Sequence, residues 1–296
     1  KVADHYGTRL VSVSKIVRMP GVSDHVDFDP ERAGEQAESL VKMAIEQFKK
    51  RKASNRAVRV PSYATRALAG FSVESIVKAL GGSLEPLLKA IQNSQIKGIA
   101  AVVGCTNNRN GHDTTSVALT RELIKRDILV INAGCVSSAV QIEGLMDPAA
   151  AAQAGAGLRG LCEALGIPPC LNFGSCVDIG RIGLAVAGIA AALGVDPSAL
   201  PVAASAPEYL EQKAVADGVF AVAMGILTHL GPVPPITGSR LVTEILGGEV
   251  QKLVGGRFLV ELDPVRAADA IEQHILEKRS GLNMEWEPAR LAEAGA

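Results

Sequence analysis

The sequence predicts an α/β protein built on a doubly wound, mainly parallel, Rossmann-like sheet. After Tyr63, short continuous apolar runs alternate with segments of helical spacing, which is typical of parallel strands covered by helices on both faces. Gly and Ala are abundant while aromatic residues make up 3% of the chain, and small residues let helices pack closely on a sheet. The net charge of -1 gives no electrostatic reason to expect binding to nucleic acid or to an anionic membrane surface.

The expected elements follow from apolar periodicity and from turn residues at their ends. Strands are expected at Leu10–Val13, Gly98–Val103, Ile128–Asn132, Pro169–Phe173, Val202–Ala204, Leu227–Leu230 and Phe258–Glu261. Helices are expected at Glu31–Arg51, Leu84–Ile91, Thr114–Arg126, Gly157–Leu165, Ile179–Leu193, Glu208–Met224, Ser239–Leu246 and Pro264–Glu277.

Three helix starts carry capping signals. Ser205 and Glu208 have the spacing of a capping box. Asp263 followed by Pro264 puts an acceptor at the N-cap and Pro at the first helical position. Asp113 precedes the helix that begins at Thr114 and can cap it.

A polar, basic connector over Arg51–Tyr63 predicts a domain boundary that separates residues 1–55 from residues 56–296. The longest apolar stretch, Ile182–Gly194, is shorter than the ~18 residues that a membrane span needs. The five cysteines are an odd number, and no secretory signal is seen, so we expect a reducing, cytoplasmic setting. The start at Lys1, without Met, suggests that residues once preceded it.

Three cysteines stand where a short apolar run must stop. Cys105 follows VVG, Cys135 follows INAG and Cys176 follows NFGS. Ligands in α/β proteins bind at the carboxyl ends of the strands, and several thiolates gathered there are typical of a metal–sulfur cluster. Gly104 and Gly134 would let a bulky cofactor approach the backbone. These three cysteines are therefore the candidate ligands for metal.

The other two cysteines are interpreted as structural. Cys162 lies within a helical pattern, and Cys170 opens the third long strand. Cys170 lies six residues before Cys176, which is roughly 20 Å in an extended chain.

Two further features could carry chemistry. Lys213 follows a strand end in EQKAVADG, where a cation could lie beside an anionic intermediate or donate a proton, although a solvated helix lysine is the simpler interpretation. His112 and Asp113 follow Cys105 closely, and a histidine beside an acid can relay protons, although a loop histidine with a capping aspartate explains the same pair. The remaining histidines have no partner pattern and are interpreted as structural: His5, His25, His229 and His274.

Long stretches of the chain resemble the C-terminal half of the anaerobic nickel–iron carbon monoxide dehydrogenases. The matching segments span nearly all of residues 6–280: YGTRLVSVSKIVRMPG, HVDFDPE, VVGCTNN, ELIKRDILV with AGC, LMDP, NFGSCVD with Arg181, SAPEYLEQKAVADG and GPVPPITGSRLVTEIL. The resemblance implies that residues 1–55 are the end of a middle α/β domain and that residues 56–296 are a C-terminal α/β domain with cluster ligands.

The resemblance also implies roles for the candidate residues. Cys105 and Cys135 would hold irons of a nickel–iron–sulfur cluster, and Cys176 would bind this cluster at its nickel edge. Lys213 would stabilise the CO₂-like intermediate and assist proton movement. The implied reaction oxidises CO with water to CO₂, two protons and two electrons, and the implied partners are a ferredoxin-like electron acceptor and a second copy of the chain.

The chain departs from the family pattern because it lacks a histidine and two cysteines that the same cluster needs. It also lacks the further cysteines that would hold electron-transfer 4Fe-4S clusters in a preceding N-terminal part. Two alternatives therefore stay open. One is a hybrid-cluster-type reductase of small nitrogen compounds, and the other is a metal-free structural or dimerisation fragment.

Overall fold

The computed structural model describes residues 9–22, 24–54 and 62–287. The chain divides into two compact units, Lys1–Tyr63 and Ala64–Ala296. The boundary predicted between residues 55 and 56 falls within 55–61, outside the described residues.

In its described residues, the first unit holds two short parallel strands and one long helix. Strands β1 (Val11–Val13) and β2 (Asp24–Val26) pair in register, and a 3-10 turn (Pro30–Arg32) leads into α2 (Ala33–Ala53). The residues of α2 all keep some exposure, although Val41, Ile45 and Phe48 recur on it at helical spacing. The expected helix over 31–51 thus forms two residues later, because Pro30 starts the turn before it.

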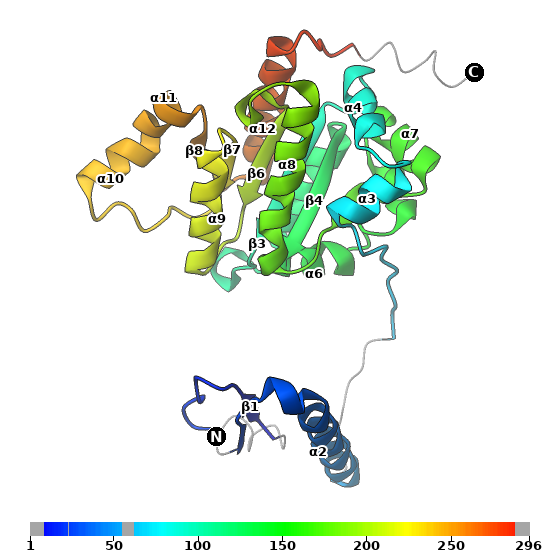
Figure 1. Cartoon of the computed structure of the whole chain (residues 1–296), viewed down its shortest axis with the longest axis vertical. Coiled ribbons are helices and arrows are strands. Elements are labelled where there is room, and N and C mark those ends of the chain that lie inside the picture. The colour runs from blue at the N-terminus through cyan, green and yellow to red at the C-terminus, as the bar shows by residue number, and fades with distance from the viewer. Residues whose placement is uncertain (1–8, 23, 55–61, 288–296) are drawn as a thin grey trace. The chain divides into compact units, whose positions relative to one another are not determined.

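The second unit is a parallel α/β domain (Figure 1). Its described strands are β3 (Gly98–Gly104), β4 (Ile128–Gly134), β5 (Cys170–Asn172), β6 (Val202–Ala206), β7 (Leu227–Leu230) and β8 (Arg257–Val260). Its described α-helices are α3 (Val73–Ala79), α4 (Glu85–Gln92), α5 (Thr114–Lys125), α6 (Cys135–Ile142), α7 (Ala156–Leu165), α8 (Ile179–Leu193), α9 (Gln212–Ala223), α10 (Arg240–Glu244), α11 (Val250–Val254) and α12 (Pro264–Gly281). The α/β class with a mainly parallel sheet is confirmed.

The sheet has the order β5-β4-β3-β6-β7-β8 within the described residues, and each neighbouring pair is parallel. The chain winds from β3 toward β5, then crosses back to add β6 on the other side of β3. This reversal makes a topological switch point between β3 and β6, where open α/β sheets place their ligands. This strand order is that of a doubly wound sheet, as the sequence predicted.

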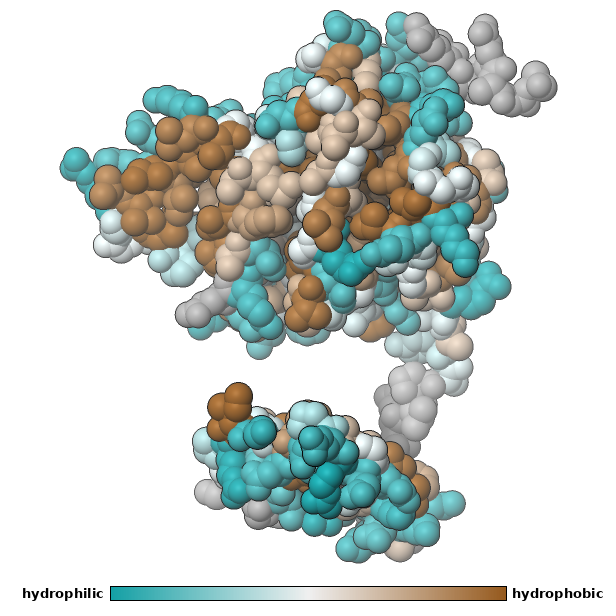
Figure 2. Space-filling model, in the orientation of Figure 1, coloured by the Kyte–Doolittle hydropathy of each residue, from teal (hydrophilic) through white to brown (hydrophobic). Residues whose placement is uncertain are grey.

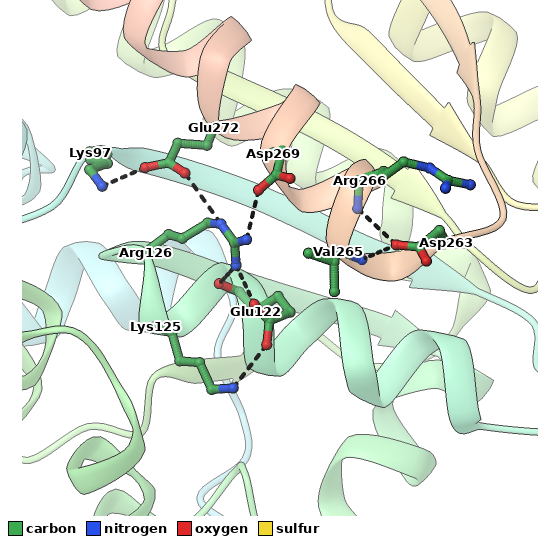
Figure 3. Close-up of polar contacts among 9 residues, drawn as sticks. All are labelled: Lys97, Glu122, Lys125, Arg126, Asp263, Val265, Arg266, Asp269 and Glu272. Atoms are coloured by element: carbon green, nitrogen blue, oxygen red, sulfur yellow. Dashed lines mark hydrogen bonds and ion pairs between the residues drawn. The ribbon is translucent and has the colours of Figure 1, made fainter.

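Helices cover both faces of the sheet. Figure 1 shows α8 and α9 in front of the sheet and α12 behind it. The buried core contains strand residues such as Val102, Val130 and Leu227, together with the inward faces of α5 and α12. On the α5–α12 side, Arg126 pairs with Glu122, Asp269 and Glu272, and Lys97 pairs with Glu272 (Figure 3).

Helix α8 differs from the expectation about apolar length. The window Cys176–Leu193 has 18 residues and a mean hydropathy of 1.8, so by length and composition alone it could cross a membrane. The expected shortfall, based on Ile182–Gly194, is therefore wrong. In this fold α8 buries Ile182, Val186 and Ile189 beside the sheet, which gives its apolar composition a role in packing.

Of the three helix-start predictions, one is confirmed and one is wrong, and the third is right about the helix start at Thr114 but not about the capping bond. Asp263 accepts hydrogen bonds from Val265 and Arg266 N–H groups, and this cap is confirmed. Ser205 instead lies in β6, where its hydroxyl contacts His229 Nδ1 at 2.8 Å, so the helix begins at Gln212 rather than Glu208. The Asp113 side chain makes no capping bond.

Beyond β7 the chain forms an apolar arm of short helices. Helix α10, a π-helical turn (Ile245–Glu249) and α11 follow one another, and no residue of the three is buried. Figure 2 shows hydrophobic residues gathered over α10 and α11, where Leu241 and Leu253 are among the most exposed large side chains.

Candidate metal centre at the carboxyl edge of the sheet

Three adjacent strands bring the candidate cysteines to one edge of the sheet. Gly104 and Gly134 are register partners at the ends of β3 and β4, and each is followed directly by a cysteine. The Gly134 N–H donates to the carbonyl of Gly174 at 2.9 Å, which ties the segment after β5 to the same edge. The parallel register therefore gathers Cys105, Cys135 and Cys176, which lie 71 residues apart at most.

Glycine is required at this edge because of both backbone conformation and space. Gly134 has φ 82° and ψ −155°, a region that side chains of L-residues rarely occupy. A Cβ atom there would lie 2.7 Å from the Gly104 carbonyl oxygen and 2.8 Å from Cys176 Sγ. The Cys176 sulfur thus lies against the backbone at Gly134, directly before Cys135.

Neighbouring groups shift the pKa of the Cys176 thiol. Burial raises the pKa of the Cys176 thiol, and nearby Cys135 and Cys105 raise it further. The Lys213 ammonium and the backbone N–H of Cys135 act in the opposite direction and lower that pKa. Gathering three thiolates is unfavourable without added positive charge, so this donor set suits a cationic metal group.

The arrangement differs from that of a single-ion site. Among the described residues, no three His, Cys, Asp or Glu side chains are placed to hold one metal ion together. A metal–sulfur cluster needs a different arrangement, because each thiolate binds a different metal atom and the sulfurs are therefore separated. Cys105 is buried, Cys135 is exposed and Cys176 is partly buried. The three residues therefore line a site that is open to solvent on one side, and they fit part of such a cluster.

Lys213 lies near this edge at the beginning of α9. Its ammonium pairs with Glu211 at 3.0 Å, and its side chain is 62% exposed. The bond to Glu211 is the main cause that raises the Lys213 pKa, and Cys176 and Cys105 also raise it. The lysine is therefore a cation close to two of the candidate ligands.

His112 and Asp113 form a pair beside Cys105. His112 Nδ1 lies 3.1 Å from Asp113 Oδ1, and its Nε2 lies 3.2 Å from the hydroxyl of Thr106, which follows Cys105. Both members of the pair have positive φ, 40° and 75°. The pair thus contacts the segment after Cys105 on one side, and its His112 side chain is exposed to solvent.

Cys162 and Cys170 lie in the core. Burial raises the pKa of Cys162 to about 12 and raises that of Cys170 as well. Both remain protonated thiols at neutral pH and pack as small apolar groups.

Two acidic residues near the site, Glu208 and Asp217, are not among the residues to which the sequence assigns a role there. Glu208 is fully buried and accepts three backbone hydrogen bonds. Asp217 is one turn after Lys213, and burial raises its pKa. It lines an apolar cavity of about 90 Å³, which also touches Gly104 and Ala214. Asp217 could have been found from the sequence, because its four-residue spacing from Lys213 puts both on one face of a helix. Glu208 could not, because its hydrogen-bond partners are about a hundred residues away in sequence.

Comparisons with known proteins agree on one family. The model of the prismane/CO dehydrogenase family matches residues 1–265. A carbon monoxide dehydrogenase of Archaeoglobus fulgidus is 49% identical over 280 residues, which cover 94% of this chain and 45% of the relative. The chain thus spans about half the length of the curated relatives it matches.

Solved structures give the same result. A nickel-free carbon monoxide dehydrogenase from Thermococcus sp. AM4, produced without a maturase, has a TM-score of 0.91 and 49% identity, over 95% of this chain and 44% of that one. Carbon monoxide dehydrogenase IV from Carboxydothermus hydrogenoformans has a TM-score of 0.90 and 47% identity, over 95% of this chain and 46% of that one.

Proposed function

Because the chain belongs to the prismane/CO dehydrogenase family, we propose that it forms the C-terminal half of an anaerobic carbon monoxide dehydrogenase. The reaction oxidises CO with water to CO₂, two protons and two electrons. The observation that carries the proposal is the meeting of Cys105, Cys135, Cys176 and Lys213 at one edge of the sheet. In this proposal residues 1–55 end a middle domain, and residues 56–296 form the C-terminal domain.

Cys105, Cys135 and Cys176 would hold part of a nickel–iron–sulfur cluster, and the rest of the protein would supply the remaining ligands. When bound, that cluster provides a metal that binds CO and a metal that activates water. The absence of a side chain at Gly134 lets Cys176 Sγ lie against the ends of β3 and β4, next to Cys105 and Cys135.

Lys213 would stabilise the negative charge that develops on the oxygens of the substrate as it becomes CO₂-like, since its ammonium lies near two of the thiols. The reaction releases two protons that must reach solvent. His112 and Asp113 would accept and pass on such a proton, because they contact each other at 3.1 Å and the His112 side chain is 61% exposed. The sequence order places this pair just after Cys105.

The proposal extends to setting and partners. Electrons would leave through 4Fe-4S clusters of the N-terminal half to a ferredoxin-like acceptor, and two copies of the whole protein would associate. The five cysteines are free thiols in this fold, which supports a reducing, cytoplasmic location.

The test is Cys176→Ala in the whole protein that contains this chain, purified without oxygen. We expect nickel to fall to background and CO oxidation to be lost, because one sulfur ligand is removed from the nickel edge. The matched control is Cys162→Ala, which removes a thiol from the core and should leave nickel content unchanged. Undiminished nickel in the Cys176 variant would sink the assignment.

Metal analysis of the 296-residue chain alone separates the half-site from a complete one. We expect nickel and iron well below stoichiometric amounts, because the described residues supply three thiolates to a cluster that needs more. Near-stoichiometric nickel with several irons per chain would contradict this expectation and show that these residues suffice.

A further inference from the structure

Glu208 is a buried carboxylate between β6 and α9 with an unusual set of partners. It is 0% exposed. Its Oε2 accepts the N–H groups of Asn107 at 3.1 Å and Asp113 at 2.8 Å, and its Oε1 accepts the N–H of Ser116 at 2.8 Å. Asn107 and Asp113 belong to the segment that connects Cys105 to α5, and Ser116 lies in the first turn of α5. One side chain from the loop after β6 therefore holds the backbone of the loop and helix start that follow Cys105.

This carboxylate replaces the local cap of α5. Asp113 occupies the N-cap position with φ 75°, but its side chain makes no capping hydrogen bond. The Ser116 N–H, in the first turn, is the group that an N-cap side chain normally satisfies. Glu208 satisfies it from across the switch point, where the positive end of the helix dipole also favours a carboxylate. The Asp113 side chain is thereby left to pair with His112.

A second hydrogen bond joins the loop after Cys105 to the loop that carries Glu208. The Asn107 side-chain amide donates to the Tyr209 carbonyl at 3.2 Å, and Tyr209 is buried. A Cβ atom at Gly231 would clash with the carbonyl of Pro207, so the Glu208 loop is also packed tightly against the end of β7. Neither loop can move at this point without breaking buried hydrogen bonds.

We propose that Glu208 is the positioning residue that fixes the Cys105 ligand loop relative to Lys213. Cys105 precedes the clamped segment by two residues, and Lys213 follows Glu208 by five residues, in the first turn of α9. Holding a ligand and a cation in one geometry supports catalysis, because a displacement of about 1 Å costs roughly 100-fold in rate. The inference rests on the proposed function and adds a residue that touches neither metal nor substrate.

The experiment uses the whole protein with Glu208→Gln. Glutamine keeps the size but offers one acceptor oxygen, and its amide hydrogens face N–H donors. We expect hydrogen exchange within residues 107–116 to accelerate by about tenfold or more, as hydrogen bonds there are lost. Turnover of CO per bound nickel should fall at least tenfold, while the KM for CO stays within about twofold.

The matched control is Glu261→Gln. Glu261 also follows a strand and accepts two backbone N–H groups, from Leu262 and Asp263, at 2.8 and 2.9 Å, and it pairs with Arg266 at the start of α12. It belongs to the loop between β8 and α12, at the far edge of the sheet. We expect its variant to accelerate exchange only in that loop and to keep wild-type turnover per nickel.

Two outcomes overturn the proposal. Unchanged exchange at residues 107–116 would show that Glu208 does not clamp the loop, and unchanged turnover per nickel would show that the clamp supports folding alone. If the Glu208 variant fails to accumulate, Asn107→Ala removes the bond to Tyr209, and the same two criteria apply. A wild-type protein that binds nickel but does not oxidise CO would instead overturn the proposed function, while the exchange result still decides the clamp.

Discussion

At the scale of single residues, the site depends on backbone positions as much as on sulfur atoms. Gly134 lies where only a residue without a side chain fits between the Gly104 carbonyl and Cys176 Sγ. The cysteines could be identified from their places after apolar runs. That they lie close together could not be predicted, because it depends on the register of β3 with β4 and on the Gly134–Gly174 hydrogen bond.

The first prediction concerns Gly134→Ala. Its backbone region costs about 1–3 kcal/mol for alanine, and the contacts at 2.7 and 2.8 Å add an overpacking cost of about 1–3 kcal/mol. We expect the free energy of unfolding of the chain, measured in urea, to fall by about 3 kcal/mol or more.

The control for that change is Gly144→Ala. Gly144 also has positive φ, 74°, but nothing lies within 4 Å of its added Cβ. Its loss should be limited to the conformational cost of about 1–2 kcal/mol. Equal losses in the two variants would mean that the close contacts at Gly134 are relieved at no cost.

At the scale of elements, long apolar strands and long helices were predictable and short segments were not. Helix α8 has the predicted bounds, since its apolar spacing is continuous. Helix α6 begins at Cys135 and was missed, because CVSSAVQI is short and rich in residues that favour other structures. Helix α9 starts four residues later than expected because Glu208 contacts α5 instead of its own helix.

A prediction at this scale concerns the packing of α5 on α12. Arg126 has 18% side-chain exposure and pairs with Glu122, Asp269 and Glu272 (Figure 3). Arg126→Ala removes one of the two cations that pair with each partly buried carboxylate, since Glu122 keeps Lys125 and Glu272 keeps Lys97. We expect a loss of about 2 kcal/mol in unfolding free energy. Thermal or urea unfolding of the chain measures it.

Arg159→Ala serves as the comparison for the α5–α12 network. Arg159 pairs with Glu163 within α7, and both side chains are more than half exposed. Such exposed pairs contribute about 0–1 kcal/mol. A loss as small as this in the Arg126 variant would indicate that the network is screened by water.

At the scale of the whole molecule, buried histidines link stability to pH. Burial lowers the pKa of His274 to about 4, and Lys278 and Arg257 lower it as well. Its ordinary value is about 6.5. Between pH 6.5 and 4 the unfolded chain binds a proton that the folded chain does not, so stability is present above this window and is lost as pH falls.

We expect the unfolding free energy of the chain to fall by about 3 kcal/mol from this histidine as pH decreases from 7 to 4. His274→Gln should flatten the dependence by that amount. Part of the slope should remain, since burial also lowers the pKa of His229. Identical pH profiles for the variant and the wild type would contradict the assignment.

The sequence by itself determined the order of the elements, the α/β class and the cysteines at strand ends, because periodicity and turn residues are local properties. The Asp263 cap belongs to this group, since its partners lie two and three residues away. Only the tertiary structure decided which strands are neighbours, that Cys176 lies against Gly134, and that Glu208 rather than Asp113 caps α5. These contacts join residues from 24 to 103 positions apart, and the contacts at the site form because parallel strands gather their carboxyl ends at one edge.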